Sequence, residues 1–313
     1  KDAYHAVVFC CGAETDRELG IPGENLPGSH AATAFVGWYN GHPDFLQHSF
    51  DLTQEQAVII GQGNVAADVC RILAKPVDDL RQTDIAEHAL QALAESRVRE
   101  IHIIGRRGPA QAKFTDKELR ELWEIPQAGV SLDPADLVLD PASAKEIEDP
   151  RGQTAAWNMA LLREFASRPL AQARRRIHFR FLESPVALYG GQNLGGAVLE
   201  KNRLEGPPFG QCALGTGVTA RLDCGLLFRS VGYKGLEMPG LPFDERRGII
   251  PNREGRVIRD GLPLAGMYCA GWIKRGPSGI IGTNRADAVE TANHLLTDMH
   301  TNASLPSKAG ASV

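Results

Sequence analysis

Short apolar runs rich in β-branched residues alternate with amphipathic stretches in the first third of the chain. The run 56–60 reads Gln-Ala-Val-Ile-Ile and ends at Gly61. Apolar positions with helical spacing follow over 65–73 and again over 84–96. A second apolar run then covers 100–104. Strand, glycine turn, helix and strand form a βαβ unit, which predicts an α/β fold with a parallel sheet.

The rest of the pattern is less regular but still divides into elements. Positions 4–11 indicate a buried strand, whereas 133–153, rich in Pro and Asp, indicate a loop. The tail 301–313 is expected to be disordered. Further elements are expected as helices at 115–124, 156–168 and 280–299, short strands and turns over 177–230, and strands at 224–230 and 266–270.

Composition narrows the class of protein. The chain has 313 residues, of which 43% are apolar and 23% charged, so a soluble protein of two domains is expected. No run approaches the roughly 18–20 apolar residues of a membrane span. A net charge of −4 argues against a nucleic-acid partner. The six cysteines include no C-x-x-C pair, which favours free thiols over a redox dithiol or a zinc site.

The segment 61–66, Gly-Gln-Gly-Asn-Val-Ala, carries the first chemical signal. It matches the dinucleotide-binding pattern G-x-G-x-x-G/A between a strand and a helix start. The first glycine permits the tight turn, the second lets the backbone approach a pyrophosphate, and the last position needs a small residue against the strand. Peptide N–H groups at the helix start would then face the phosphates. The alternative is a purely structural glycine turn.

The second signal is Gly105-Arg106-Arg107, at the end of the next predicted strand. Sites for NAD usually carry Asp or Glu there, where the carboxylate binds the ribose 2′-hydroxyl. Two guanidinium groups instead suit the 2′-phosphate of NADP(H), which an acid would repel. The alternative is a solvated arginine pair in a loop. The position relative to the glycine turn favours NADP(H).

A third segment, 271–281, follows a predicted strand and opens a predicted helix. Backbone N–H groups of Gly279 to Ile281 would point at an anion or an electron-rich ring edge, and Trp272 could cover a flat ring. A helix start with a packed tryptophan explains the same residues. The physical argument leaves both interpretations open.

Six segments together resemble the adrenodoxin reductase-type ferredoxin–NADP+ reductases. Their order and spacing also match that family, so the resemblance covers nearly the whole chain. It implies two Rossmann-like, glutathione-reductase-like nucleotide-binding domains. It also implies a flavoenzyme that passes electrons from NADPH through FAD to a ferredoxin- or adrenodoxin-type iron–sulfur protein. The segments are 35–41 (FVGWYNG), 58–66 (VIIGQGNVA), 105–109 (GRRGP), 117–121 (KELRE), 230–233 (SVGY) and 271–277 (GWIKRGP).

The resemblance implies a role for each motif by position. No metal is implied, and no catalytic acid or base is assigned beyond possible roles for Asp68 and Glu118. Asp68 matches an acidic position near the family's active site, although a helix-surface aspartate is the alternative. The NADP contacts would be Gln62, Gly63, Asn64 and Val65 to the pyrophosphate, Arg106 and Arg107 to the 2′-phosphate, and Glu118 to the nicotinamide half. The FAD contacts would be Trp272, Gly279, Ile280 and Ile281, with Gly279 also near NADP.

The family's first FAD-binding βαβ unit, with its own G-x-G-x-x-G turn, does not precede Tyr4. The FAD domain is therefore expected to be only partly present, as a strand within 1–15 and a C-terminal part at 237–300. An NADP-binding domain is expected at 16–236, with the tail at 301–313. Most of the FAD site would then lie on a complementary N-terminal segment.

An acidic ferredoxin would need a basic docking surface. The candidates are Arg163, Arg168, Arg174, Arg175 and Arg176, although an ordinary solvated helix end is the alternative. Two rival functions share the coenzyme site: a glutamate-synthase-type or electron-bifurcating flavin reductase subunit, and a non-catalytic NADP(H)-binding fragment. The former should carry iron–sulfur cysteine clusters, which this chain lacks. The expected compartment is the cytoplasm in a bacterium or the mitochondrial matrix in a eukaryote, with the cytoplasm preferred.

Overall fold

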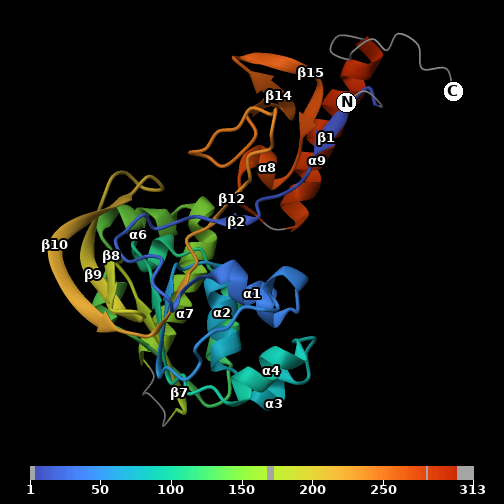
Figure 1. The fold of residues 1–313 in the computed structure, drawn as a ribbon. Coiled ribbons are helices and arrows are strands. Elements are labelled where there is room, and N and C mark those ends of the chain that lie inside the picture. The colour runs from blue at the N-terminus through green and yellow to red at the C-terminus, as the bar shows by residue number, and fades with distance from the viewer. Residues whose placement is uncertain (1–3, 168–172, 280, 302–313) are drawn as a thin grey trace. The chain divides into compact units, whose positions relative to one another are not determined.

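The computed structural model of the chain describes residues 4–167, 173–279 and 281–301, in two units (Figure 1). The first unit combines Lys1–Arg17 with Gly232–Val313, and the second is Glu18–Val231. The sequence placed these boundaries at 15/16 and 236/237. Residues just after Gly232 group with the first unit because β12 (Tyr233–Lys234) pairs antiparallel with β2 (Thr15–Asp16). The expected tail lies outside the described residues from 302 onward.

The second unit is built on a six-stranded parallel sheet. β4 and β5 pair from Gln56↔Glu100 to Ile60↔Ile104, so their carboxyl ends reach the same edge of the sheet. The predicted α/β class and βαβ unit are confirmed. In spatial order the strands are β3 (Ser29–Ala31), β11 (Leu226–Arg229), β4 (Gln56–Ile60), β5 (Glu100–Ile104), β7 (Arg175–Arg180) and β6 (Ala128–Leu132).

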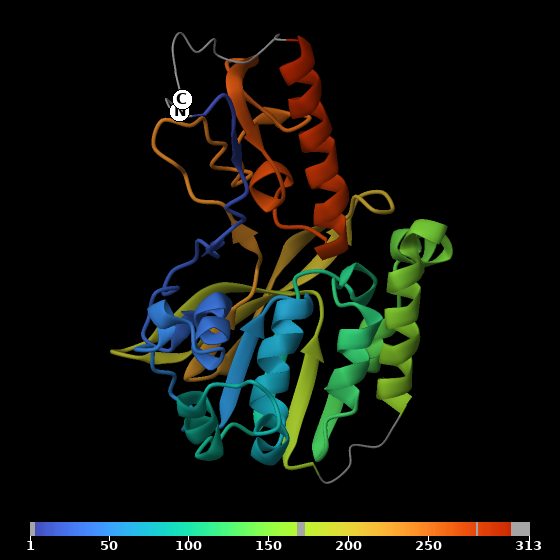
Figure 2. The ribbon, with the colours of Figure 1, turned by 90° about the vertical axis from the view of Figure 1, so that its right-hand side faces the viewer.

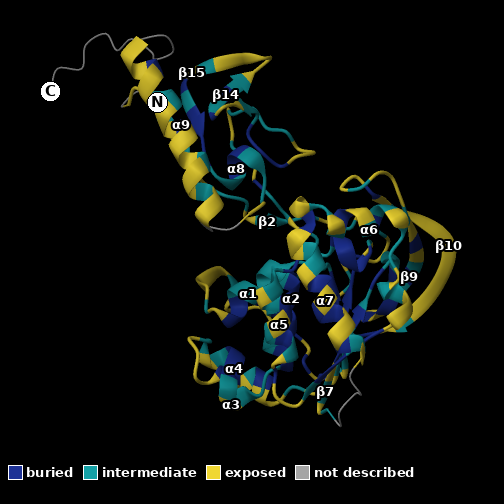
Figure 3. Cartoon of the chain, turned by 180° about the vertical axis from the view of Figure 1, so that it is seen from behind, coloured by how far each residue is buried: buried dark blue, intermediate teal, exposed yellow. Residues whose placement is uncertain are grey.

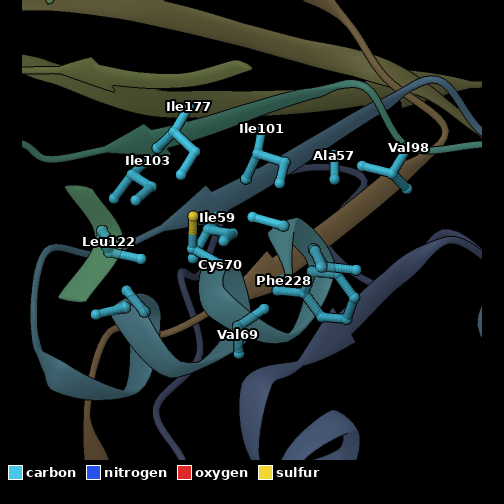
Figure 4. Packing of buried hydrophobic residues seen from close by; sticks show 14 of the residues in the cluster. Ala57, Ile59, Val69, Cys70, Val98, Ile101, Ile103, Leu122, Ile177 and Phe228 are labelled. Atoms are coloured by element: carbon cyan, nitrogen blue, oxygen red, sulfur yellow. The ribbon is translucent and has the colours of Figure 1, made fainter. Parts of the chain in front are cut away.

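Helices cover one face of this sheet (Figure 2). Val69 and Leu122 from the helices pack with Ile59, Ile101 and Phe228 from the strands (Figure 4). Burying one such side chain stabilises the fold by about 1.5–3 kcal/mol, so this cluster anchors the helices against the strands. The helices are α1 (Ala32–Tyr39), α2 (Asn64–Ala74), α5 (Asp116–Trp123) and α7 (Gln153–Ser167).

The opposite face of the sheet carries a second core. Successive residues of a strand point to opposite faces, so Ile59 joins the helical core, whereas Val58 and Ile60 pack with Leu199 and Leu227. The cover here is an antiparallel sheet ordered β10-β9-β8. Most of β10 is exposed (Figure 3). Its strands are β8 (Glu183–Gly190), β9 (Leu194–Glu205) and β10 (Cys212–Asp223).

The prediction of a loop over 133–153 was wrong, because this stretch contains α6. The Asp140 side chain accepts hydrogen bonds from the N–H groups of Ala142 and Ser143, and Pro141 occupies the first turn. Asp followed by Pro is therefore a helix start here rather than a turn. The connections of this unit contain η1 (Pro43–Phe45), α3 (Val77–Leu80), α4 (Glu87–Ala94), η2 (Pro109–Gln111), η3 (Pro134–Leu137), α6 (Pro141–Glu148) and η4 (Pro150–Gly152).

The first unit has a smaller sheet ordered β1-β15-β14-β13 over a core of Ile250, Val257, Cys269 and Ile273. The predicted strand at 4–11 is shorter than expected, because only its middle pairs with β15. No helix in the described ranges is long and apolar enough to cross a membrane. The elements are β1 (Val7–Phe9), β13 (Asn252–Arg253), β14 (Arg256–Arg259), β15 (Leu262–Cys269), α8 (Trp272–Arg275) and α9 (Ile281–Thr301).

Candidate functional site

Gly61 follows β4 in a conformation that the fold itself requires. Its φ is +132°, a region in which L side chains are strained. A Cβ at this position would collide with the carbonyl oxygen of Ser230, just beyond β11. The Gly61 N–H donates to the carbonyl of Ile104 at 2.8 Å, which ties the turn to the end of β5. This glycine lets three neighbouring backbones approach one another.

Gly63 has no such structural requirement. Its φ of −126° and ψ of −179° are extended and open to any residue. The nearest heavy atom to a Cβ built there is the Cβ of Lys113, at an ordinary contact distance of 3.9 Å. Gly63 caps α2, whose first N–H groups have no carbonyl partner within the helix. Open space beside these donors fits an approaching phosphate.

The polar side chains of the turn fix its shape. Gln62 donates from Nε2 to the Arg180 carbonyl at 3.0 Å, and its own carbonyl accepts from the Lys113 N–H at 2.7 Å. Asn64 Oδ1 accepts from the Thr115 N–H at 2.9 Å. These side chains are engaged within the protein, so their contact with a ligand would come from the backbone.

Arg106 and Arg107 follow β5 at the same edge of the sheet. Arg106 is exposed and Arg107 is half-buried. Their backbone is held by bonds from the Leu182 N–H to the Arg107 carbonyl at 3.0 Å and from Asn202 Nδ2 to the Arg106 carbonyl at 2.9 Å. Burial, and then the like charge of Arg106, lower the pKa of the Arg107 guanidinium, with Glu146 opposing them. A dianionic phosphate would relieve the repulsion between the two cations.

Asp68 and Glu118 both contact Arg71, a residue that the sequence did not indicate as part of the site. Arg71 donates to both carboxylates, with 2.9 Å between Arg71 Nη2 and Glu118 Oε2. It also donates to Glu121. The three-residue spacing of Asp68 and Arg71 on α2 was a visible signal. The partners on α5 were not visible, because they depend on how the two helices pack.

The first unit contains a cavity of about 820 Å³, whose walls are rich in glycine. A Cβ at Gly12, Gly271 or Gly282 would have no atom within 4 Å. Trp272 lines this cavity and stacks on Tyr233, with ring centroids 5.9 Å apart. Its buried Nε1–H has no hydrogen-bond partner among the described residues. Open backbone and an unsatisfied donor fit a flat ligand that carries an acceptor at its edge.

Gly279 also lines the cavity, at the turn before α9. Its φ is +79°, and a Cβ there would lie 2.6 Å from Thr283 Oγ1, so the turn itself requires glycine. Ile280 lies outside the described residues. Ile281 opens α9, although its side chain also lies outside the described part. The sequence analysis missed Cys10 and Asn284 as cavity-lining residues.

The candidate docking arginines do not form one exposed group. Arg163, Arg174 and Arg176 are exposed. Arg175 donates to the carbonyls of Val98 at 3.2 Å and Lys75 at 2.8 Å, and Arg176 pairs with Glu100. Arg168 lies outside the described residues. Arg175 and Arg176 begin β7 and Arg174 directly precedes it, so they lie at the sheet edge opposite the glycine turn, roughly 20 Å away at 3.3 Å per residue.

Comparisons with known proteins give close relatives. No protein-family model matches the chain. NADPH-ferredoxin reductase FprA of Mycobacterium tuberculosis (strain H37Rv) is 46% identical over 304 residues, covering 96% of this chain and 64% of FprA. The mitochondrial NADPH:adrenodoxin oxidoreductase of Arabidopsis thaliana is 42% identical, covering 99% of this chain and 67% of that protein.

A solved structure of Mycobacterium tuberculosis FprA in complex with NADPH also matches. Its TM-score is 0.90 at 45% identity, and the match covers 98% of this chain and 67% of that chain. The chain thus spans about 64% of the length of the FprA proteins that it matches.

Proposed function

Because the chain belongs to the family of NADPH-ferredoxin reductase FprA and NADPH:adrenodoxin oxidoreductase, as its motifs predicted, we propose that it serves in electron transfer from NADPH through FAD to a ferredoxin-type iron–sulfur protein. One observation carries the proposal. The open glycine turn after β4 and the arginine pair after β5 lie at one edge of one sheet. Neighbouring strands thereby offer a pyrophosphate site and a 2′-phosphate site.

The second unit would hold NADP(H). Gln62 and Asn64 keep the turn rigid, and the 2′-phosphate would lie between the guanidinium groups of Arg106 and Arg107. Glu118 would face the nicotinamide half of the coenzyme. The pyrophosphate would rest against backbone N–H groups of Gln62, Gly63, Asn64 and Val65.

The first unit would hold part of FAD in its glycine-rich cavity. Trp272 would cover the flat ring system and donate its free Nε1–H to an acceptor on the cofactor. The proposed FAD contacts on this side are Gly279, which lines the cavity, with Ile280 and Ile281.

When bound together, nicotinamide and flavin supply hydride transfer followed by single-electron delivery. The protein's contribution is binding and orientation. The turn and the arginines fix the adenosine and pyrophosphate parts, which sets where the nicotinamide end can reach. No side chain of this chain needs to act as a general acid or base in such a reaction.

The partner would be an acidic iron–sulfur protein that docks on a basic surface. Arg163, Arg168, Arg174 and the exposed Arg176 remain candidates for that surface, although Arg176 also pairs with Glu100. Arg175 instead donates to backbone carbonyls. Docking through charge should weaken as salt rises. The proposed compartment is the bacterial cytoplasm, or the mitochondrial matrix in a eukaryote.

The proposal is tested first by titrating the purified chain with NADP+ and NAD+ in a calorimeter. We expect NADP+ to bind at least tenfold more tightly, because only it carries the phosphate that Arg106 and Arg107 would hold. Equal affinities would overturn the coenzyme assignment. Electron transfer is tested by adding FAD and following ferredoxin-dependent reduction of cytochrome c by NADPH. Coenzyme binding without flavin binding would instead support the rival of a non-catalytic NADP(H)-binding fragment.

A further inference from the structure

Arg71 forms ion pairs with three carboxylates from two helices. It lies on α2 with Asp68, one turn away, and reaches across to Glu118 and Glu121 on α5. Lys117 is a second and looser cation, 3.8 Å from Glu121. The Arg71 cluster, meaning Arg71 with Asp68, Glu118 and Glu121, carries a net charge of −2 when all four groups are ionised.

The cluster is only partly open to water. The Arg71 side chain is 18% exposed and that of Glu118 is 21% exposed. Burial alone would lower the pKa of the guanidinium, but the neighbouring carboxylates of Asp68, Glu118 and Glu121 outweigh it and raise that pKa. Charges at such a depth are screened less than surface charges, so their effect extends to a ligand close by.

The cluster lies directly behind the glycine turn. Asp68 is four residues along α2 from Asn64, or about 6 Å along the helix axis. Asn64 also accepts from the Thr115 N–H, and Thr115 caps α5 by accepting from the Glu118 N–H. The same short chain of bonds therefore fixes both the turn and Glu118.

Charge decides which half of the coenzyme can face these carboxylates. The adenosine half of NADP(H) carries the 2′-phosphate dianion, which a cluster of charge −2 would repel. The nicotinamide half instead offers ribose hydroxyl donors and a ring that is cationic in NADP+ and neutral in NADPH. We infer that Arg71 is a positioning residue that holds Asp68 and Glu118 toward the nicotinamide half, and that the cluster's negative charge favours the oxidised coenzyme over the reduced one. This inference rests on the proposed NADP(H) site.

The test compares three ligands: NADP+, NADPH and adenosine 2′,5′-bisphosphate, which lacks the nicotinamide half. Dissociation constants are measured for the wild type, Glu118→Gln, Arg71→Met and Arg71→Lys. Glu118→Gln should raise the ratio of the NADP+ constant to the NADPH constant about three- to tenfold. Arg71→Met removes a positive charge and should lower this ratio by a similar factor. Arg71→Lys should return it to the wild-type value, and the bisphosphate should bind all four proteins equally.

Glu118→Gln and Arg71→Met should shift the ratio of the NADP+ and NADPH constants in opposite directions. Loosened packing between the two helices would not produce opposite shifts, so the result separates an effect of charge from an effect of structure. Glu118→Gln keeps the shape of the side chain, so this variant should fold like the wild type. Arg81→Met, which removes an exposed partner of Asp78, is the matched control and should change nothing. Equal ratios in all variants, or shifts of the same sign, would overturn the inference while leaving the proposed function intact. Failure of the wild type to bind the bisphosphate would instead overturn the proposed function.

Discussion

Gly61 and Gly63 are separated only by Gln62, yet they are glycine for different reasons. Gly61 is needed by the protein, because its φ is +132° and a side chain would meet the Ser230 carbonyl. Gly63 has ordinary backbone angles and open space. The glycine that the fold does not need is therefore the one at which we propose that a ligand binds.

Gly63→Val should abolish NADP+ binding while the protein stays folded. Its extended backbone suits a β-branched residue, but the side chain would fill the space that a pyrophosphate needs. Calorimetric titration measures the affinity and circular dichroism checks the fold. An unchanged dissociation constant would show that the turn binds no coenzyme.

Gly61→Val is the matched variant within the same turn, and it should lose stability. Strain at positive φ alone costs on the order of 1–3 kcal/mol, and the collision with Ser230 adds to it. A thermal melt should therefore show a clear drop for this variant and little change for Gly63→Val. Equal melting temperatures would mean that the distinction between the two glycines is wrong.

Arg106→Ala/Arg107→Ala should weaken NADPH binding by more than tenfold and leave NADH almost unaffected. A hydrogen bond to a charged group contributes about 1.5–3 kcal/mol, and only NADPH carries the phosphate. Fluorescence titration of both coenzymes on both proteins measures the difference. Arg163→Ala, an exposed arginine on α7, is the control. A similar loss for NADH would point to a structural role for the pair.

Asp140 caps α6 and links it to Gln211, the residue before β10. Its carboxylate accepts from the N–H groups of Ala142 and Ser143 and from Gln211 Nε2 at 2.9 Å. Asp140→Ala should lower the free energy of unfolding by about 0.5–2 kcal/mol, the usual effect of losing an N-cap. Denaturant titration measures it. A change within error would show that α6 holds its place by packing alone.

The effect of Asp140 should depend on pH. Burial opposes its ionisation, but hydrogen bonds from Ser143, Gln211 and Ala142 outweigh burial and lower its pKa in the folded state. The stabilisation is therefore fully present above the unfolded pKa, which is about 3.9, and is lost as pH falls through the lower folded value. The stability gap between wild type and Asp140→Asn should stay constant between about pH 6 and about pH 5, and should narrow below about pH 4.

At the scale of the whole molecule, the glycine-rich cavity lies in the first unit and the glycine turn lies in the second. Each ligand should therefore protect a different unit from amide hydrogen exchange. NADP+ should slow amide hydrogen exchange at 61–66 and 105–108 and leave β14 unchanged. FAD should slow exchange at 10–12 and 271–275, which line or adjoin the glycine-rich cavity. Mass spectrometry of peptides after exchange gives both patterns. NADP+ protection confined to the first unit would contradict the assignment of the coenzyme to the second.

Signals that are local along the chain could be predicted from the sequence. The β-branched run before Gly61, the small residue at Ala66 and the arginine pair at 106–107 are such signals. Strand ends that are neighbours in a βαβ unit must meet at one edge of a parallel sheet, so the glycine turn and the arginines could be placed together in advance. The proposed coenzyme site therefore followed from chain order and backbone geometry.

Contacts between elements that are distant in sequence were decided only by the tertiary structure. Arg71 meets Glu118 because α2 and α5 pack side by side, and no spacing in the sequence encodes that distance. Arg175 was expected on a docking surface, yet the fold places carbonyl oxygens around its guanidinium. The requirement at Gly61 likewise comes from β11, far along the chain. Such features depend on contacts across the sheet between residues that lie far apart in the sequence.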